Sequence, residues 1–67
     1  MNNEYLPQNR FLRLRQVMEL ISLSRTKIYD MQAEGTFPRS FQLTEHAVAW
    51  LESEVAMWMA ERVRTAH

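Results

Sequence analysis

The chain has 67 residues, of which 46% are hydrophobic and 24% are charged. A chain of this length forms one domain with a modest core, because so small a domain buries only about 60% of the surface that its unfolded chain exposes. Eight basic residues balance eight acidic ones, so the formal net charge is zero. The overall charge therefore supplies no long-range attraction to nucleic acid, and any contact with DNA must depend on where individual charges are placed.

The composition excludes several kinds of site. Without cysteine there is no disulfide, no thiol nucleophile and no cysteine-based zinc site, and two histidines cannot hold a metal alone. The chain also has no glycine-rich phosphate loop. We therefore expect no enzymatic activity, no cofactor and no metal.

No apolar run approaches a membrane span, and the first ten residues do not resemble a signal peptide, so we expect a cytoplasmic protein without membrane contact.

The N-terminal third begins with a polar stretch that contains Pro7, which disfavours regular helix. We expect a flexible arm over residues 1–9 and a folded domain over residues 10–67. After a short extended piece near residues 11–14, the spacing of apolar residues predicts an amphipathic helix over about residues 15–21. The residues of this apolar stripe are Leu14, Val17, Leu20 and Ile21.

Clear boundary signals surround a second helix, which we expect from about Arg25 to Glu34. Ser24 can accept a hydrogen bond from the backbone N–H of residue 26 or 27, as N-terminal capping residues do. Gly35 can adopt the left-handed conformation that ends many helices, and Pro38 prevents continuation.

The period then changes to that of strands. Phe41 and Leu43 alternate with polar residues, and Val48 and Trp50 alternate with alanines. This pattern predicts a hairpin of strands 41–43 and 48–50, although its turn has no Asn-Gly or Asp-Gly pair and a loop with one strand is the alternative.

From Leu51 onward the helical period returns, with acids in the first turn and arginines in the last. Its apolar stripe consists of Leu51, Val55, Trp58, Met59 and Val63. We interpret the tryptophans and the neighbouring methionines as core and oligomer surface rather than as residues that stack on nucleic acid.

This order of elements, mainly helical with a small β-hairpin, is that of a winged helix-turn-helix, in which the second helix enters the major groove. Many such folds use the motif only for packing. On a helical wheel Ile28 and Met31 share one face and Thr26 and Asp30 the opposite one. Arg25 and Lys27 flank that outer face, where the helix dipole disfavours cations; they are either phosphate contacts or simply solvated.

Four segments, "LRLRQV", "LSRTKIY", "EGTFPRSFQL" and "AWLESEVAMWM", occur in an order that resembles the AlpA family of phage and genomic-island regulators. The resemblance implies a MerR-like and excisionase-like winged helix that binds DNA as repeated copies. It assigns DNA contact to residues of the second helix, which are Ser24, Arg25, Thr26, Lys27 and Tyr29. At the wing, where the sequence departs from the family, we add Arg39 and His46 as candidate contacts.

Three positions leave alternatives open. Tyr29 is either a phosphate contact or a half-buried aromatic with its hydroxyl at the surface, and we favour the latter. Asp30 replaces a residue that is commonly basic in the family; it could accept a hydrogen bond from cytosine, but we favour a surface pair with Lys27. The wing tip "TEHA" is acidic where the family is basic, so Arg39 at the base of the wing is either a replacement contact or a solvated loop arginine.

We therefore expect a nucleoid-associated protein that binds repeated sites in double-stranded DNA sequence-specifically and cooperatively. It would act at a promoter as a transcriptional regulator, at an attachment site as a recombination directionality factor (excisionase), or at both. An integrase or recombinase and further copies of the chain are the expected partners. The alternative is a protein-interaction adaptor that holds a recombinase or regulator through the last helix without contacting DNA.

Overall fold

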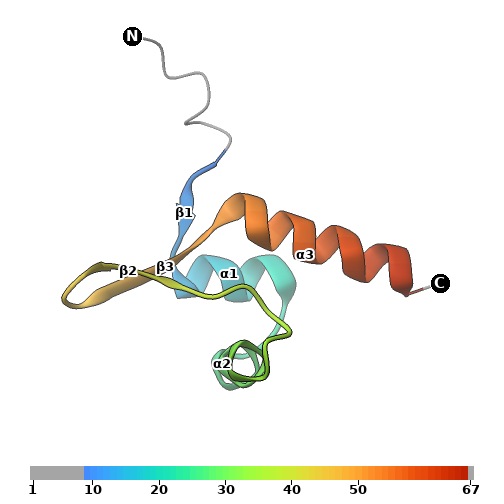
Figure 1. Cartoon of the computed structure of the whole chain (residues 1–67), viewed down its shortest axis with the longest axis horizontal. Helices are drawn as coiled ribbons and strands as arrows, with labels where there is room; N and C mark the ends of the chain where they lie inside the picture. Colours follow the sequence, from blue (N-terminus) through green and yellow to red (C-terminus); the bar gives the residue numbers. More distant parts are fainter. Residues whose placement is uncertain (1–8, 67) are drawn as a thin grey trace, which may run out of the picture.

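A computed structural model of the chain describes residues 9–66. It confirms the mainly helical fold with a small hairpin, and the predicted boundaries agree with the structure to within one residue. Its elements in chain order are β1 (Phe11–Leu12), α1 (Leu14–Ile21), α2 (Arg25–Glu34), β2 (Phe41–Thr44), β3 (Ala47–Leu51) and α3 (Glu52–Thr65) (Figure 1). No helix in this part of the chain has the length and apolar character needed to cross a membrane. The predicted arm lies, except for residue 9, outside the described residues.

Both ends of α2 form as their residues predict. The Ser24 side chain accepts a hydrogen bond from the backbone N–H of Lys27 at 3.2 Å. At the other end Gly35 has a φ of 81°, and its N–H donates to the carbonyls of Gln32 and Met31. A side chain at Gly35 would meet no atom within 4 Å, so glycine is favoured there by its backbone conformation rather than by space.

The hairpin is extended by a third strand that the sequence pattern did not reveal. The sheet has the order β1-β3-β2, and both pairings are antiparallel. In β1, Leu12 lies opposite Trp50 and Phe11 lies opposite Leu51. The extended piece predicted before α1 is therefore part of the sheet, and it connects the start of the domain to the strand that leads into α3.

The core lies between one face of the sheet and the helices. Its buried side chains are Leu12, Val17, Ile28, Met31, Phe37, Trp50 and Val55. Two residues of the predicted apolar stripes are exposed instead, Leu20 by 44% and Val63 by 64%. In α3 only the first half, around Val55, packs on the core, because the second half extends beyond the sheet (Figure 1).

The other face of the sheet carries a pair of aromatic rings. Phe11 and Phe41 come from the two outer strands, and their rings contact each other edge to face with centroids 6.2 Å apart. Ala49 of β3, which pairs with Phe41 in register, is fully buried. Phe11, Ala49 and Phe41 thus share the face of the sheet opposite that of Leu12 and Trp50.

We expect Ile28→Ala to lower the free energy of unfolding by about 2–5 kcal/mol, because it leaves a cavity beneath α2. The matched control is Leu20→Ala, on an exposed position, which we expect to cost no more than about 1 kcal/mol. Urea denaturation followed by circular dichroism measures both. Equal losses in the two variants would contradict this description of the core.

Candidate nucleic-acid interface

Helix α2 presents a polar face to solvent and an apolar face to the core. Ile28 is fully buried and Met31 is 7% exposed, and these two side chains fix the helix against the domain. Arg25, Thr26 and Lys27 are all exposed on the first turn. The structure therefore separates the two faces as the helical wheel predicts, and it places four of the predicted DNA-binding residues, Ser24 included, at one helix end.

The electrostatics of this helix end favour an anion. The first turn of α2 contains no acidic residue, and a helix N-terminus carries unpaired N–H groups and a partial positive charge. Ser24 uses its oxygen as an acceptor from Lys27, so its O–H group is free to donate to another acceptor. Together with the two cations, these groups form a surface suited to a phosphate.

Tyr29 connects the exposed cation Arg25 to the core. The Arg25 guanidinium carbon lies 6.0 Å from the centroid of the Tyr29 ring, within the range of a cation–π contact. On its other side the ring packs on Trp50, with centroids 6.0 Å apart. Tyr29 is thus half-buried, as we favoured from the sequence, and its ring lies against both Arg25 and Trp50.

The indole of Trp50 joins α2 to the loop that precedes the hairpin. Its Nε1–H group donates to the side-chain oxygen of Gln32 at 3.1 Å and to the carbonyl of Pro38 at 3.0 Å. The same Gln32 oxygen accepts the backbone N–H of Ser40 at 3.0 Å. One buried indole and one glutamine therefore fix the loop that carries Arg39 relative to α2.

Sequence reasoning did not identify Gln32 as part of the site. A signal was present, because Gln32 follows Met31 and lies four residues after Ile28, which places it on the buried side of α2. A polar side chain in such a position must find hydrogen-bond partners. The sequence does not indicate that those partners are Trp50 and Ser40.

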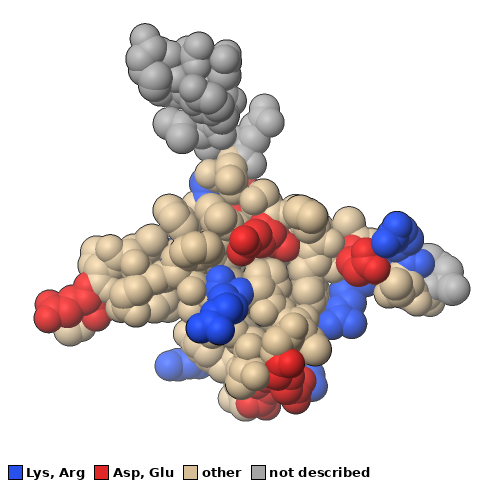
Figure 2. Space-filling model, viewed as in Figure 1, with Lys and Arg blue, Asp and Glu red and all other residues tan. Residues whose placement is uncertain are grey.

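Asp30 of α2 and Arg39 of the loop that follows the helix are both exposed. The predicted surface pair between Lys27 and Asp30 is wrong, since neither residue belongs to an ion pair within residues 9–66. Water solvates two such exposed charges well, so three-residue spacing alone does not bring them together. Basic and acidic side chains intermingle around α2 (Figure 2), and Asp30 remains free to accept a hydrogen bond.

His46 lies apart from the other predicted residues, in the turn between β2 and β3. Its side chain is 91% exposed, and its Nε2 atom lies 3.9 Å from a carboxylate oxygen of Glu45. Figure 2 shows acidic atoms at the far end of the hairpin. The structure thus brings Ser24, Arg25, Thr26, Lys27 and Tyr29 together, places Arg39 on the adjoining loop, and leaves His46 beside an acid.

We expect Gln32→Leu to speed hydrogen exchange of the Ser40 amide and to lower the free energy of unfolding by about 1–3 kcal/mol, because a buried N–H loses its acceptor. Glu34→Leu is the control on the same helix, at an exposed position, and we expect it to leave the Ser40 amide unchanged. Exchange measured by NMR separates the two. Unaltered Ser40 exchange in Gln32→Leu would show that this hydrogen bond does not fix the loop.

Comparison with known proteins adds an independent finding to this geometry. A family model described as "Prophage CP4-57 regulatory protein (AlpA)" matches residues 10–63. An uncharacterized protein of Enterobacteria phage P4, ORF88, is 48% identical over 58 residues, which cover 87% of this chain and 66% of that protein. The chain thus spans slightly less than two thirds of the length of this relative.

A second relative is the DNA-binding transcriptional activator AlpA of Escherichia coli strain K12. It is 31% identical over 61 residues, which cover 82% of this chain and 87% of the relative. The matched region of the family model includes all three helices up to residue 63, both strands of the hairpin and every residue of the candidate site. From the family match and the two relatives, we conclude that the chain belongs to the AlpA family of prophage regulatory proteins.

Proposed function

We propose that this protein binds double-stranded DNA sequence-specifically through α2 and thereby regulates transcription in a phage or genomic island. The observation that carries the proposal is the N-terminal turn of α2, where Arg25 and Lys27 are exposed without an acidic neighbour in that turn. Cations at this position oppose the helix dipole by roughly 0.3–1 kcal/mol each. A functional surface accounts for such a local cost. The DNA-binding activator among the relatives supports the same assignment.

The exposed residues of α2 divide into two roles. Thr26 and Asp30, on the outermost face, are short enough to let the backbone approach base edges, and Asp30 can accept a hydrogen bond from cytosine N4. Arg25 and Lys27 flank them and would contact phosphates, together with the Ser24 hydroxyl. Arg39 extends this set at the base of the wing. We assign no phosphate contact to the wing tip, because Glu45 stands next to His46 there.

Several copies are needed for useful affinity. With zero net charge and Arg25, Lys27 and Arg39 as the cations of the candidate site, one copy neutralises few phosphates. We therefore propose cooperative binding to repeated sites, in which each copy adds a small contact area.

Recombination is the second process in which the same surface would act. An excisionase and a transcriptional regulator of this size use the same DNA contacts, so the geometry supports both roles equally. An integrase gene beside this one, and loss of excision on deletion of the protein, would support the directionality role. A promoter that responds to the protein without any change in excision would restrict it to transcription.

An adaptor that holds a recombinase or regulator is the competing function. It is favoured by one observation, the exposed apolar side chains near α3, of which Met57 is 72% exposed. An adaptor would bind its protein partner equally well after the cations of α2 are removed, whereas a DNA-binding regulator would lose its DNA.

We expect Arg25→Ala/Lys27→Ala to weaken binding to DNA from the protein's own promoter or attachment site by roughly tenfold or more, because two charged contacts are lost. Arg62→Ala/Arg64→Ala is the matched control, since it removes the same charge from the far end of α3. Gel-shift titrations at two salt concentrations measure both variants. We expect the salt slope to fall by about 2 in the α2 variant only.

Two results would overturn this assignment. Unchanged affinity of Arg25→Ala/Lys27→Ala, with the fold confirmed by circular dichroism, would remove α2 from the interface. Equal weakening in both double variants would indicate that total charge, rather than the position of α2, determines binding.

Cooperativity gives a separate expectation. On DNA with two sites, we expect the second copy to bind roughly tenfold or more tightly than the first, whereas DNA with a single site binds weakly. Quantitative footprinting on one-site and two-site fragments measures the ratio. Tight binding of one copy to one short site would contradict the proposal.

A further inference from the structure

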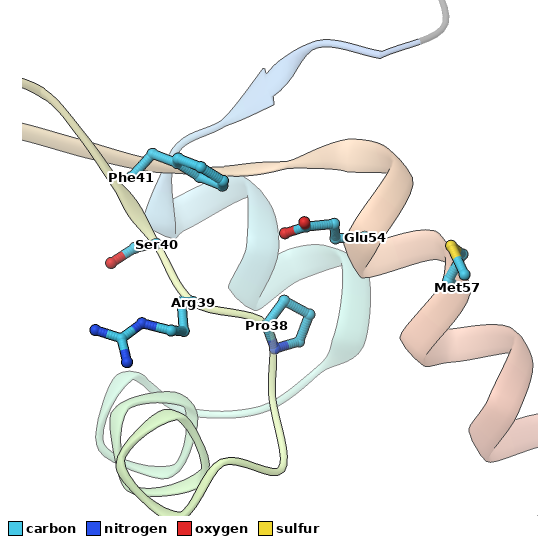
Figure 3. A pocket seen from close by; sticks show the side chains of 6 residues that line it. All are labelled: Pro38, Arg39, Ser40, Phe41, Glu54 and Met57. Carbon is cyan, nitrogen blue, oxygen red and sulfur yellow. The ribbon is translucent and has the colours of Figure 1, made fainter.

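A groove separates the loop before β2 from the first turns of α3. It has a volume of about 500 Å³ and is open to solvent. Its lining residues are Pro38, Arg39, Ser40, Phe41, Glu54 and Met57 (Figure 3). An adjoining hollow of about 460 Å³ shares Pro38, Glu54 and Met57 with it, so the depression continues along α3. We call these two hollows together the α3 groove.

The side chains around the α3 groove are unusually apolar for an exposed surface. Met57 is 72% exposed and Phe41 is 41% exposed, and the Phe41 ring contacts Phe11, which is 47% exposed. Single exposed apolar residues are common, but a contiguous group marks an interaction site. Met57 stands between the two hollows as a flexible projection, the kind of side chain that fits an irregular depression.

The size of this apolar surface indicates what it binds. With the exposed fractions above, the three side chains offer on the order of 300 Å². A stable protein interface buries about 800 Å² on each partner. The groove therefore suits a weak dimer, which forms in free solution only at high protein concentration and which DNA strengthens by bringing two copies together.

The charges at the groove favour a second copy of this chain as the occupant. Glu54 points into the gap from α3, while Arg39 is directed away from it on the other side of the loop (Figure 3). Neither residue forms an ion pair in the described part of the chain. In a two-fold contact, if a residue of one copy faces a given residue of the other, the reverse pair forms as well. A single two-fold rotation would therefore place Arg39 of each copy beside Glu54 of the other.

We propose that two copies associate through their α3 grooves around a two-fold axis. Met57 of each copy inserts into the hollow beside Pro38 and Phe41 of the other, and Arg39 of each copy faces Glu54 of the other. This inference names the contact behind the cooperative binding described above, and its consequence for DNA rests on that proposed function. A two-fold pair reads two half-sites of opposite direction, so the paired sites are inverted repeats rather than direct ones.

Sedimentation of the full chain without DNA tests the contact independently of DNA binding. The wild-type chain will show a concentration-dependent shift from monomer to dimer and no larger species. Met57→Glu will remain monomeric at every concentration. Val63→Glu is the matched control, since it changes an exposed apolar residue of the same helix outside the groove, and it will dimerise like the wild type.

Charge reversal tests the two-fold pairing itself. Glu54→Arg and Arg39→Glu will each weaken the dimer at least tenfold, and the double reversal will restore most of it. Circular dichroism confirms that each variant is folded. A wild-type chain that stays monomeric, a dimer unaffected by Met57→Glu, association into open chains, or a double reversal without recovery would each overturn the proposal.

DNA binding is then measured with Met57→Glu on one-site and two-site duplexes. Unchanged binding to one site with loss of cooperativity on two inverted sites supports the groove contact. Cooperativity that survives in Met57→Glu, or that needs direct repeats, overturns it. Absence of DNA binding by the wild-type chain would instead refute the proposed function and leave the result of sedimentation valid.

Discussion

The buried indole of Trp50 is the constraint on which the placement of the site depends. Its side chain is fully buried, and its N–H group contacts both Gln32 of α2 and the carbonyl of Pro38. A buried indole N–H without an acceptor would cost about 1–3 kcal/mol, so these partners stabilise the folded domain. They also fix α2 and the loop with Arg39 against β3, which positions every cation assigned to DNA.

A protein without net charge can still present a local anion-binding surface. Arg25 and Lys27 lie where the helix dipole adds to their charge, and Arg25 is supported by the ring of Tyr29. The first turn of α2 has no acid, whereas Asp30 and Glu34 lie further along the helix, Glu45 lies at the hairpin tip and Glu54 at the α3 groove. This arrangement agrees with the proposed contact of the first turn of α2 with DNA and with the proposed contact between copies at the α3 groove.

The local features of this fold could be predicted, whereas the long-range contacts could not. Ser24 and Gly35 determine the ends of α2 through their own backbone groups, so their residue types were sufficient. The pairing of Leu12 with Trp50 joins segments far apart in the chain, and no short pattern encodes it. The same holds for the hydrogen bonds of Gln32. The sequence placed Val63 on the apolar stripe of α3, but it does not show how far along α3 the packing against the core extends. Val63 is therefore exposed although its spacing predicts burial.

The central claim, that the N-terminal turn of α2 contacts DNA, is tested most directly by NMR of the isotope-labelled chain during titration with duplexes from the region around its own gene. The account predicts that the largest amide shifts occur at residues 24–27 and at Arg39, with little change in the last turn of α3. Shifts confined to α3 and the groove, with residues 24–27 unaffected, would contradict it.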